Sequence, residues 1–140
     1  MISYQTENFG NRYEYRSNPH TDYIVPPHIH DYSEIAFTKS GCTTVLVNGK
    51  KYLLQENCLI FILPNQIHEY SAETYSNMRC AVFSNDFIPV FFEKIADMQL
   101  KNPVIDLSGD KWLLEQLDKV CPTDTLKICG ILNLICEKIE

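Results

Sequence analysis

Residues 28–41 have the sequence His28-Ile-His30-Asp-Tyr-Ser-Glu34-Ile-Ala-Phe-Thr-Lys-Ser-Gly41. The apolar and β-branched residues in the middle of this stretch favour a β-strand. Because strand side chains alternate between two faces, one predicted face carries His28, His30, Glu34 and Ala36, and the other carries Ile35 and Phe37. Two imidazoles and a carboxylate are costly to bury unless they bind one another or a ligand. The stretch therefore predicts a strand with a polar site on one face.

A second stretch, Asn57-Cys-Leu-Ile-Phe-Ile-Leu-Pro64-Asn-Gln-Ile-His68, adds a third histidine after an apolar strand and a turn. Together the two stretches resemble the two motifs of the cupin family. Asn57 replaces the usual glycine of the second motif, which is a mild departure because Asn readily adopts a positive φ. The spacing Pro-x-x-x-His is similar to that in the N-terminal domains of AraC-type transcription regulators, and the resemblance extends over about residues 10 to 85.

The resemblance implies a mainly β fold: a cupin, jelly-roll-like β-barrel with a C-terminal helical extension of about three helices. The barrel is expected in residues 1–84 and the helical extension in residues 85–140, packed together as one structural domain. A chain of 140 residues is long enough for one such domain. Short strands at even spacing through 33–84 support a barrel or sandwich. Asn48-Gly49 predicts a tight hairpin, and residues 17–20 predict a turn with His20 in solvent.

After residue 84 the apolar residues recur at the helical period. They predict helices over 88–95, capped by Asn85 or Asp86, over 109–120, capped by Ser108, and from about Thr123 to the C-terminus. The last helix is apolar around most of its circumference, so it must bury two sides. Its second side is predicted to form a dimer interface through Ile128, Ile131, Leu132, Ile135 and Ile139. The alternative is that this helix packs between the barrel and the 109–120 helix.

The resemblance also implies that His28, His30, Glu34 and His68 can hold a divalent transition metal (Zn, Ni, Fe or Mn), since imidazole and carboxylate suit these ions. The same four residues and Tyr70 are the expected ligand-binding site, and no catalytic residue is assigned. In the alternative, no metal is bound. The histidines are then hydrogen-bonded to one another, to Glu34, or to the hydroxyl groups of Tyr32 and Tyr70.

Composition excludes several classes of function. The net charge of −6 opposes binding to nucleic acid. Neither a secretion signal nor a stretch that could span a membrane is visible, so a cytoplasmic protein without membrane contact is expected. The six cysteines are scattered, and reduced thiols are expected.

These features favour a small-molecule-sensing and dimerisation domain of an AraC-type transcription regulator. Its effector would bind in the barrel, a homodimer would form through the C-terminal helix, and the DNA-binding part is expected to be absent from this chain. The chain would then be an excised domain or a stand-alone descendant of such regulators. The alternative is a stand-alone metal-dependent cupin enzyme, a dioxygenase or isomerase acting on a small polar substrate, which the intact ligand set favours.

Overall fold

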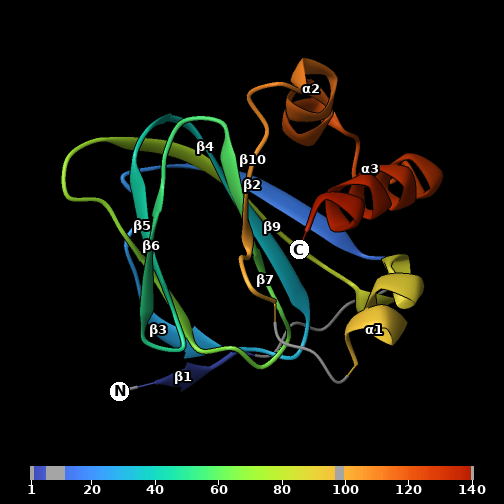
Figure 1. The fold of residues 1–140 in the computed structure, drawn as a ribbon, viewed down its shortest axis with the longest axis horizontal. Coiled ribbons are helices and arrows are strands. Elements are labelled where there is room, and N and C mark those ends of the chain that lie inside the picture. The colour runs from blue at the N-terminus through green and yellow to red at the C-terminus, as the bar shows by residue number, and fades with distance from the viewer. Residues whose placement is uncertain (1, 6–11, 97–99, 140) are drawn as a thin grey trace.

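The computed structural model describes residues 2–5, 12–96 and 100–139. Two five-stranded sheets pack against each other, and the helices lie on the outer side of one of them (Figure 1). The first sheet has the order β1-β3-β8-β5-β6 and comprises β1 (Ser3–Tyr4), β3 (Val25–Ile29), β8 (His68–Ser71), β5 (Thr43–Val47) and β6 (Lys50–Leu54). The second has the order β10-β7-β4-β9-β2 and comprises β10 (Val104–Asp106), β7 (Cys58–Ile62), β4 (Ser33–Gly41), β9 (Ser76–Phe83) and β2 (Tyr15–Thr21). The predicted mainly β, jelly-roll-like fold is confirmed.

The helical part begins with the 3-10 turn η1 (Asn85–Phe87) and continues with α1 (Pro89–Ile95), α2 (Lys111–Lys119) and α3 (Thr125–Lys138). The three predicted helices are therefore present. Segment 85–140 also supplies β10, which extends the second sheet by pairing with β7. Among the described residues, no helix is both long and apolar enough to cross a membrane.

The second sheet separates two hydrophobic cores, and the alternation of strand side chains explains why. On β4, Ile35 and Phe37 face the helices, whereas Ala36 faces the first sheet. The inner strand β7, next to β4, is apolar at every position and buries successive residues on opposite sides. A sheet that is covered on both faces needs such continuous apolar strands. The polar side chains of the two motifs therefore share the space between the sheets with one of these cores.

The prediction of a turn over residues 17–20 is wrong, because these residues form part of β2. The prediction gave weight to Pro19, which lacks the N–H that a central strand needs. Since β2 is the edge strand of its sheet, a proline is tolerated there. His20 consequently lies in a strand opposite Met78, and its side chain is not simply solvated, as the cavity described below shows.

Two helices begin at other residues than the sequence predicted. Neither Asn85 nor Asp86 caps the predicted 88–95 helix, because α1 follows Ile88, which makes no side-chain capping bond. Ser84 caps η1 and accepts a hydrogen bond from the Asp86 N–H. Asp110, not Ser108, caps α2 through a 3.0 Å bond from the Leu113 N–H. Ser and Asp are both favoured at N-caps, so α2 has a cap of the expected class two residues later than predicted, whereas α1 has no side-chain cap.

The structure corrects the assignment of the dimer interface. Four of the five residues predicted for it, Ile128, Ile131, Leu132 and Ile135, are buried in this chain's own core at 2% exposure or less, and Ile139 packs against the same core. They contact the outer side of the second sheet and the neighbouring helices, so they are not available to a second subunit. The alternative, in which the helix packs within its own chain, describes this face correctly. Dimerisation itself stays a prediction.

Candidate metal centre

The predicted site residues come together between the two sheets. His28 lies on β3 and pairs directly with His68 on β8, His30 follows the end of β3, and Glu34 reaches in from β4 of the opposite sheet. One ligand atom from each of these four side chains lies within 4.8 Å of the other three. All four side chains are buried, at 1–5% exposure. The fifth predicted residue, Tyr70, donates a short hydrogen bond to Oε2 of Glu34.

Backbone carbonyl groups orient all three imidazole rings. Nδ1 lies 3.1 Å from the Pro26 oxygen in His28, 3.0 Å from the Tyr32 oxygen in His30, and 2.8 Å from the Gln66 oxygen in His68. A carbonyl oxygen only accepts hydrogen bonds, so each Nδ1 carries the proton. In a neutral imidazole the other nitrogen, Nε2, then has a lone pair and no proton. The backbone therefore prepares three Nε2 atoms as electron-pair donors.

These electron-pair donors face a carboxylate instead of proton donors. Nε2 of His30 lies 3.1 Å from Oε1 of Glu34, and Nε2 of His68 lies 3.4 Å from Oε2. The second contact is not a hydrogen bond, and Nε2 of His68 is a buried polar atom without a partner. Lone pairs that face one another in a buried place are unfavourable. A cation between them, either a proton or a metal ion, removes the repulsion.

The donor set fits a divalent transition metal. Three imidazole nitrogens and one carboxylate oxygen are ligands that Zn, Fe, Ni and Mn accept. The carbonyl groups on Nδ1 and the Tyr70 hydroxyl on Glu34 provide the outer hydrogen bonds that normally hold such ligands in place. The cluster contains no cysteine, and the six cysteines are all free thiols.

The electrostatics of the cluster are those of a buried carboxylate among imidazole rings. Burial alone would raise the pKa of Glu34, but its contacts with His30, His68 and Tyr70 outweigh burial and hold this pKa well below its usual range. Burial would lower the pKa of His68, yet the adjacent Glu34 carboxylate raises it overall. Burial lowers the pKa of His28, and the neighbouring His68 adds to that effect. Glu34 is thus a buried anion that draws either a proton onto His68 or a metal ion into the cluster.

A cavity of about 200 Å³ adjoins the cluster and includes both His28 and Glu34 in its wall. The remaining wall comes partly from the inward side of β2, through Arg16, Asn18 and His20. These three residues were not among those predicted from the sequence. Their spacing of two is the signal of one strand face, but the mistaken turn over residues 17–20 concealed it.

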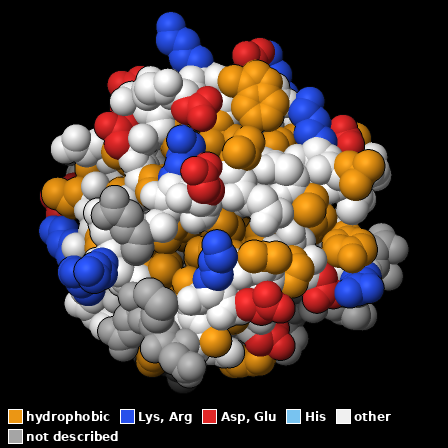
Figure 2. Space-filling model, turned by 45° about the vertical axis from the view of Figure 1, so that its right-hand side comes forward, with side chains coloured by type: hydrophobic (Ala, Val, Ile, Leu, Met, Phe, Trp, Pro, Cys, Tyr) orange, Lys and Arg blue, Asp and Glu red, His pale blue; other side chains and the backbone are white. Residues whose placement is uncertain are grey.

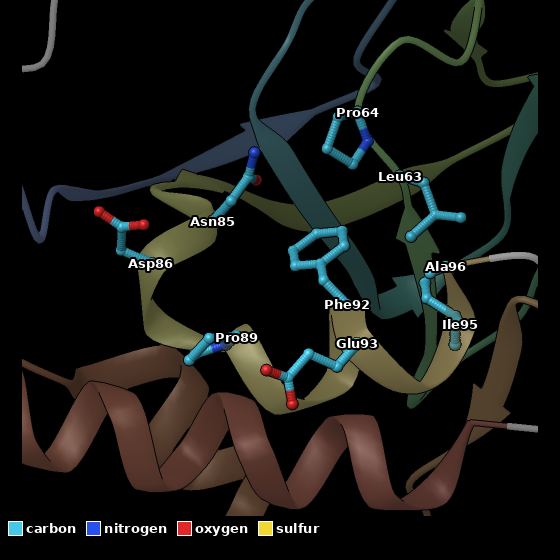
Figure 3. Close-up of a pocket in the computed structure, with 9 residues that line it drawn as sticks. All are labelled: Leu63, Pro64, Asn85, Asp86, Pro89, Phe92, Glu93, Ile95 and Ala96. Atoms are coloured by element: carbon cyan, nitrogen blue, oxygen red, sulfur yellow. The ribbon is translucent and has the colours of Figure 1, made fainter.

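A larger groove of about 740 Å³ lies elsewhere, between α1 and the end of β7. Figure 3 shows the rings of Phe92 and Pro64 toward this space, with the carboxylates of Asp86 and Glu93 around it. The groove is open to solvent and contains none of the four cluster residues. Volume alone does not identify a functional site, and the smaller cavity is the one in which ionisable groups converge.

Comparisons with known proteins agree with the fold. Residues 12–105 match the family model described as the AraC-like ligand binding domain. ToxT from Vibrio cholerae is similar in structure, with a TM-score of 0.62 and 11% identity over 91% of this chain and 56% of ToxT. A cupin protein from Bacteroides fragilis gives a TM-score of 0.48 and 22% identity over 51% of this chain and 67% of that protein. This chain thus spans little more than half of ToxT. No curated protein matches the sequence.

Proposed function

Because the chain belongs to the family of AraC-like ligand-binding domains, we propose that it is the effector-sensing domain of a transcription regulator that acts in the cytoplasm. The effector site is the cavity beside His28, His30, Glu34 and His68. The observation that carries this proposal is the convergence of four buried ligand atoms beside a cavity whose wall includes two of the four residues, His28 and Glu34. A pocket with a few convergent polar groups and perturbed pKa values is the usual form of a small-molecule site.

The four cluster residues would hold a zinc, nickel, iron or manganese ion. A bound ion would supply an electron-pair acceptor for an oxygen or nitrogen atom of the effector. The chain's own groups keep the ligands ready for it. The three backbone carbonyls fix the imidazole orientations, and the Tyr70 hydroxyl fixes Glu34. Burial raises the pKa of Tyr70, so its hydroxyl stays protonated and continues to donate.

Asn85 connects the site to the helices. Its Oδ1 accepts a 2.6 Å hydrogen bond from Ser33, the neighbour of Glu34 on β4, and its Nδ2 donates to the Asp31 carbonyl at 3.2 Å. Asn85 also begins η1, whose last residue, Phe87, accepts a 3.2 Å hydrogen bond from Asn133 of α3. A change around Glu34 can therefore reach α3 through hydrogen bonds. Such differential contacts are what allow an effector to shift a conformational equilibrium.

Hydrogen exchange tests this connection. With one equivalent of zinc bound, we expect amides of η1 and of the first turns of α3 to exchange about tenfold more slowly, within the usual range of coupling between sites. In Asn85→Ala, zinc should still slow exchange in β3 and β8, but the effect on η1 and α3 should be lost. Mass spectrometry of peptides from each element measures both effects.

Asn102→Ala is the matched control, because it removes a comparable side-chain hydrogen bond. In this bond Oδ1 of Asn102 accepts the N–H of Val104, the first residue of β10, at 3.0 Å. This variant should behave as wild type. Equal slowing of η1 and α3 in wild type and Asn85→Ala would contradict the role of Asn85. No change in exchange anywhere on addition of zinc would contradict the metal centre.

A homodimer through α3 remains part of this proposal, with the interface moved to the outer side of the helix. Leu126 and Leu134 of α3 are 86% and 44% exposed, and Val90 of α1 is 56% exposed. Figure 2 shows hydrophobic side chains among charged ones over this side of the molecule. Pairing two copies of one face by a two-fold axis would bury these side chains in both subunits.

Leu126→Asp with Leu134→Asp should therefore convert a dimer into a monomer at micromolar concentration. Since both residues lie outside the core, the melting temperature of the subunit should change by no more than a few degrees. Light scattering and circular dichroism measure the two properties. Ile131→Asp with Ile135→Asp is the comparison variant. It would bury charges in the core of the subunit and therefore unfold it, unlike the substitutions at the exposed leucines. A wild-type chain that is a monomer under these conditions would exclude the dimer.

A metal-dependent enzyme is the second candidate, and the intact set of three histidines and one glutamate favours it. The two candidates differ in what happens to the bound molecule. A sensor releases its ligand unchanged, whereas an oxygenase or isomerase converts it. Mass spectrometry of a ligand that has been recovered from zinc-, iron- or nickel-loaded protein distinguishes them.

A further inference from the structure

Of the four cluster residues, His30 alone lies outside the strands, in the connection between β3 and β4. His28 and His68 lie opposite each other on paired strands, and Glu34 belongs to β4. The His30 carbonyl accepts a 2.7 Å hydrogen bond from the Asn65 N–H, which holds the main chain but not the ring. A side chain on a connection needs contacts of its own to keep one orientation, because no ladder of backbone hydrogen bonds places it.

Tyr32 supplies two such contacts to the His30 ring. Its backbone oxygen accepts the hydrogen bond from Nδ1 of His30 at 3.0 Å. Its own ring stacks on the imidazole, with centroids 3.9 Å apart and an angle of 4° between the planes, whereas the rings of His28 and His68 meet His30 tilted or edge-on. Both His30 and Tyr32 are buried. The oxygen fixes the direction of one ring nitrogen and the stacked face fixes the ring plane, so together they direct Nε2 into the cluster.

Asn85 holds both chain neighbours of Tyr32. Its Nδ2 donates to the Asp31 carbonyl at 3.2 Å, and its Oδ1 accepts the Ser33 hydroxyl at 2.6 Å. Tyr32 lies between these two anchors, so Asn85 determines where the Tyr32 oxygen and ring lie. Since Asn85 is the first residue of η1, the helical part of the molecule holds this connection in place.

Tyr32 also forms part of the wall of the cavity of about 200 Å³, together with His28 and Glu34. A molecule in this cavity would therefore lie beside the residue that stacks on His30. Tyr32 thus contacts a metal ligand on one side, adjoins the cavity on another, and is held through its neighbours by the helices.

We propose that Tyr32 is the positioning residue of the metal centre, and that the helices influence metal binding through it. This inference rests on the proposed function, because it names the residue that joins the metal ligands to Asn85. An imidazole that binds a cation carries part of its charge, and an aromatic face stabilises positive charge. The stacked ring should therefore favour the metal-bound state of His30, in addition to orienting the imidazole.

Tyr32→Leu should weaken zinc binding by about tenfold or more, which is the usual effect of losing an outer contact of a metal ligand. Tyr32→Phe keeps the ring and the backbone oxygen, so it should bind zinc within about threefold of wild type. Competition with a chromogenic chelator measures the affinities. The visible absorption of the cobalt-loaded chain reports the geometry of the ligands. It should change in Tyr32→Leu and stay as in wild type in Tyr32→Phe.

Tyr15→Leu is the matched control, since Tyr15 is also a buried tyrosine whose ring stacks on another, that of Phe83, with centroids 6.3 Å apart. It belongs to the core on the helix side of the second sheet. The loss of this ring should lower the melting temperature, as the loss of the Tyr32 ring does, but leave the zinc affinity and the cobalt spectrum as in wild type. Circular dichroism measures the melting temperatures and verifies that the variants fold.

Asn85→Ala is a second test, which removes no buried ring. It should weaken zinc binding by about threefold, within the usual range of coupling between distant positions. In the double variant with Tyr32→Leu, loss of Asn85 should have little further effect on zinc affinity, because the residue through which it acts has gone. Such a double-mutant cycle separates a coupled pair from two independent sites.

Wild-type zinc affinity in Tyr32→Leu, or equal losses in Tyr32→Leu, Tyr32→Phe and Tyr15→Leu, would overturn the role of the Tyr32 ring and leave the metal centre in place. Unchanged zinc affinity in Asn85→Ala, or a full further loss in the double variant, would overturn the link to the helices. A wild-type chain that binds neither zinc nor cobalt would overturn the metal centre and this inference together.

Discussion

Replacement of His68 by alanine should lower the affinity of the chain for zinc about 100-fold. Zinc sites of four protein ligands bind the ion with an apparent free energy of about 10–16 kcal/mol. One ligand in four therefore contributes about 3 kcal/mol, a factor of about 100 in affinity. The Nε2 atom of His68 is a buried acceptor without a hydrogen bond in this fold. Competition with a chromogenic chelator, followed by elemental analysis of dialysed protein, measures the loss.

The matched control is His20→Ala, because His20 is the only histidine of the four in the sequence that lies outside the cluster. It should bind zinc with wild-type affinity and stoichiometry close to one. Wild-type protein that was purified without chelator and retains less than about a tenth of an equivalent of any transition metal would contradict the metal centre. Equal losses in the two variants would show that the assay does not report on this cluster.

Replacement of Gly41 by alanine should destabilise the fold by more than about 4 kcal/mol, a loss that few single substitutions reach. Gly41 has a φ of +80°, which by itself costs an alanine about 1–2 kcal/mol. An added Cβ would also lie 2.0 Å from the backbone oxygen of Tyr75. That oxygen accepts the Cys42 N–H at 2.9 Å, so the backbone has to shift and this bond, just beyond the end of β4 and before the start of β9, weakens. Thermal unfolding should show a melting temperature lower by about 10 °C or more.

Gly49→Ala provides the comparison that isolates the close approach. Gly49 has nearly the same φ, +83°, but no atom lies within 4 Å of an added Cβ. Gly49→Ala should therefore lower the free energy of unfolding only by the cost of a positive φ in alanine, about 1–2 kcal/mol. If the two variants melt at the same temperature, the contact with Tyr75 does not determine the need for glycine at position 41.

Much of the site could be predicted from sequence because its signals are local. The two motifs identified the four residues that converge, His28, His30, Glu34 and His68. The prediction that the first three share one face of a single strand is wrong, because His28 lies on β3 and Glu34 on β4 of the opposite sheet. The hairpin at Asn48-Gly49 was equally local: both residues have positive φ, 49° and 83°, as a tight turn of this type requires.

The parts that could not be predicted depend on partners distant in sequence. Pro19 indicated a turn, yet β2 is an edge strand that pairs with β9 alone among the described strands, and edge position is not visible in a single segment. The role of Asn85 likewise appears only when η1 meets β4, 52 residues away from Ser33 in sequence. That Arg16, Asn18 and His20 line a cavity likewise became visible only once β2 was placed beside the cluster.

The sequence by itself determined which residues of α3 are apolar and that the helix must bury more than one side. Only the tertiary structure decided what covers each side. Ile128, Ile131, Leu132 and Ile135 pack into the core formed with the second sheet, while Leu126 and Leu134 stay exposed. Hydrophobic burial is non-directional and depends on the area removed from water. A helical pattern therefore specifies how much surface must be covered, and the arrangement of the other elements specifies which surface covers it.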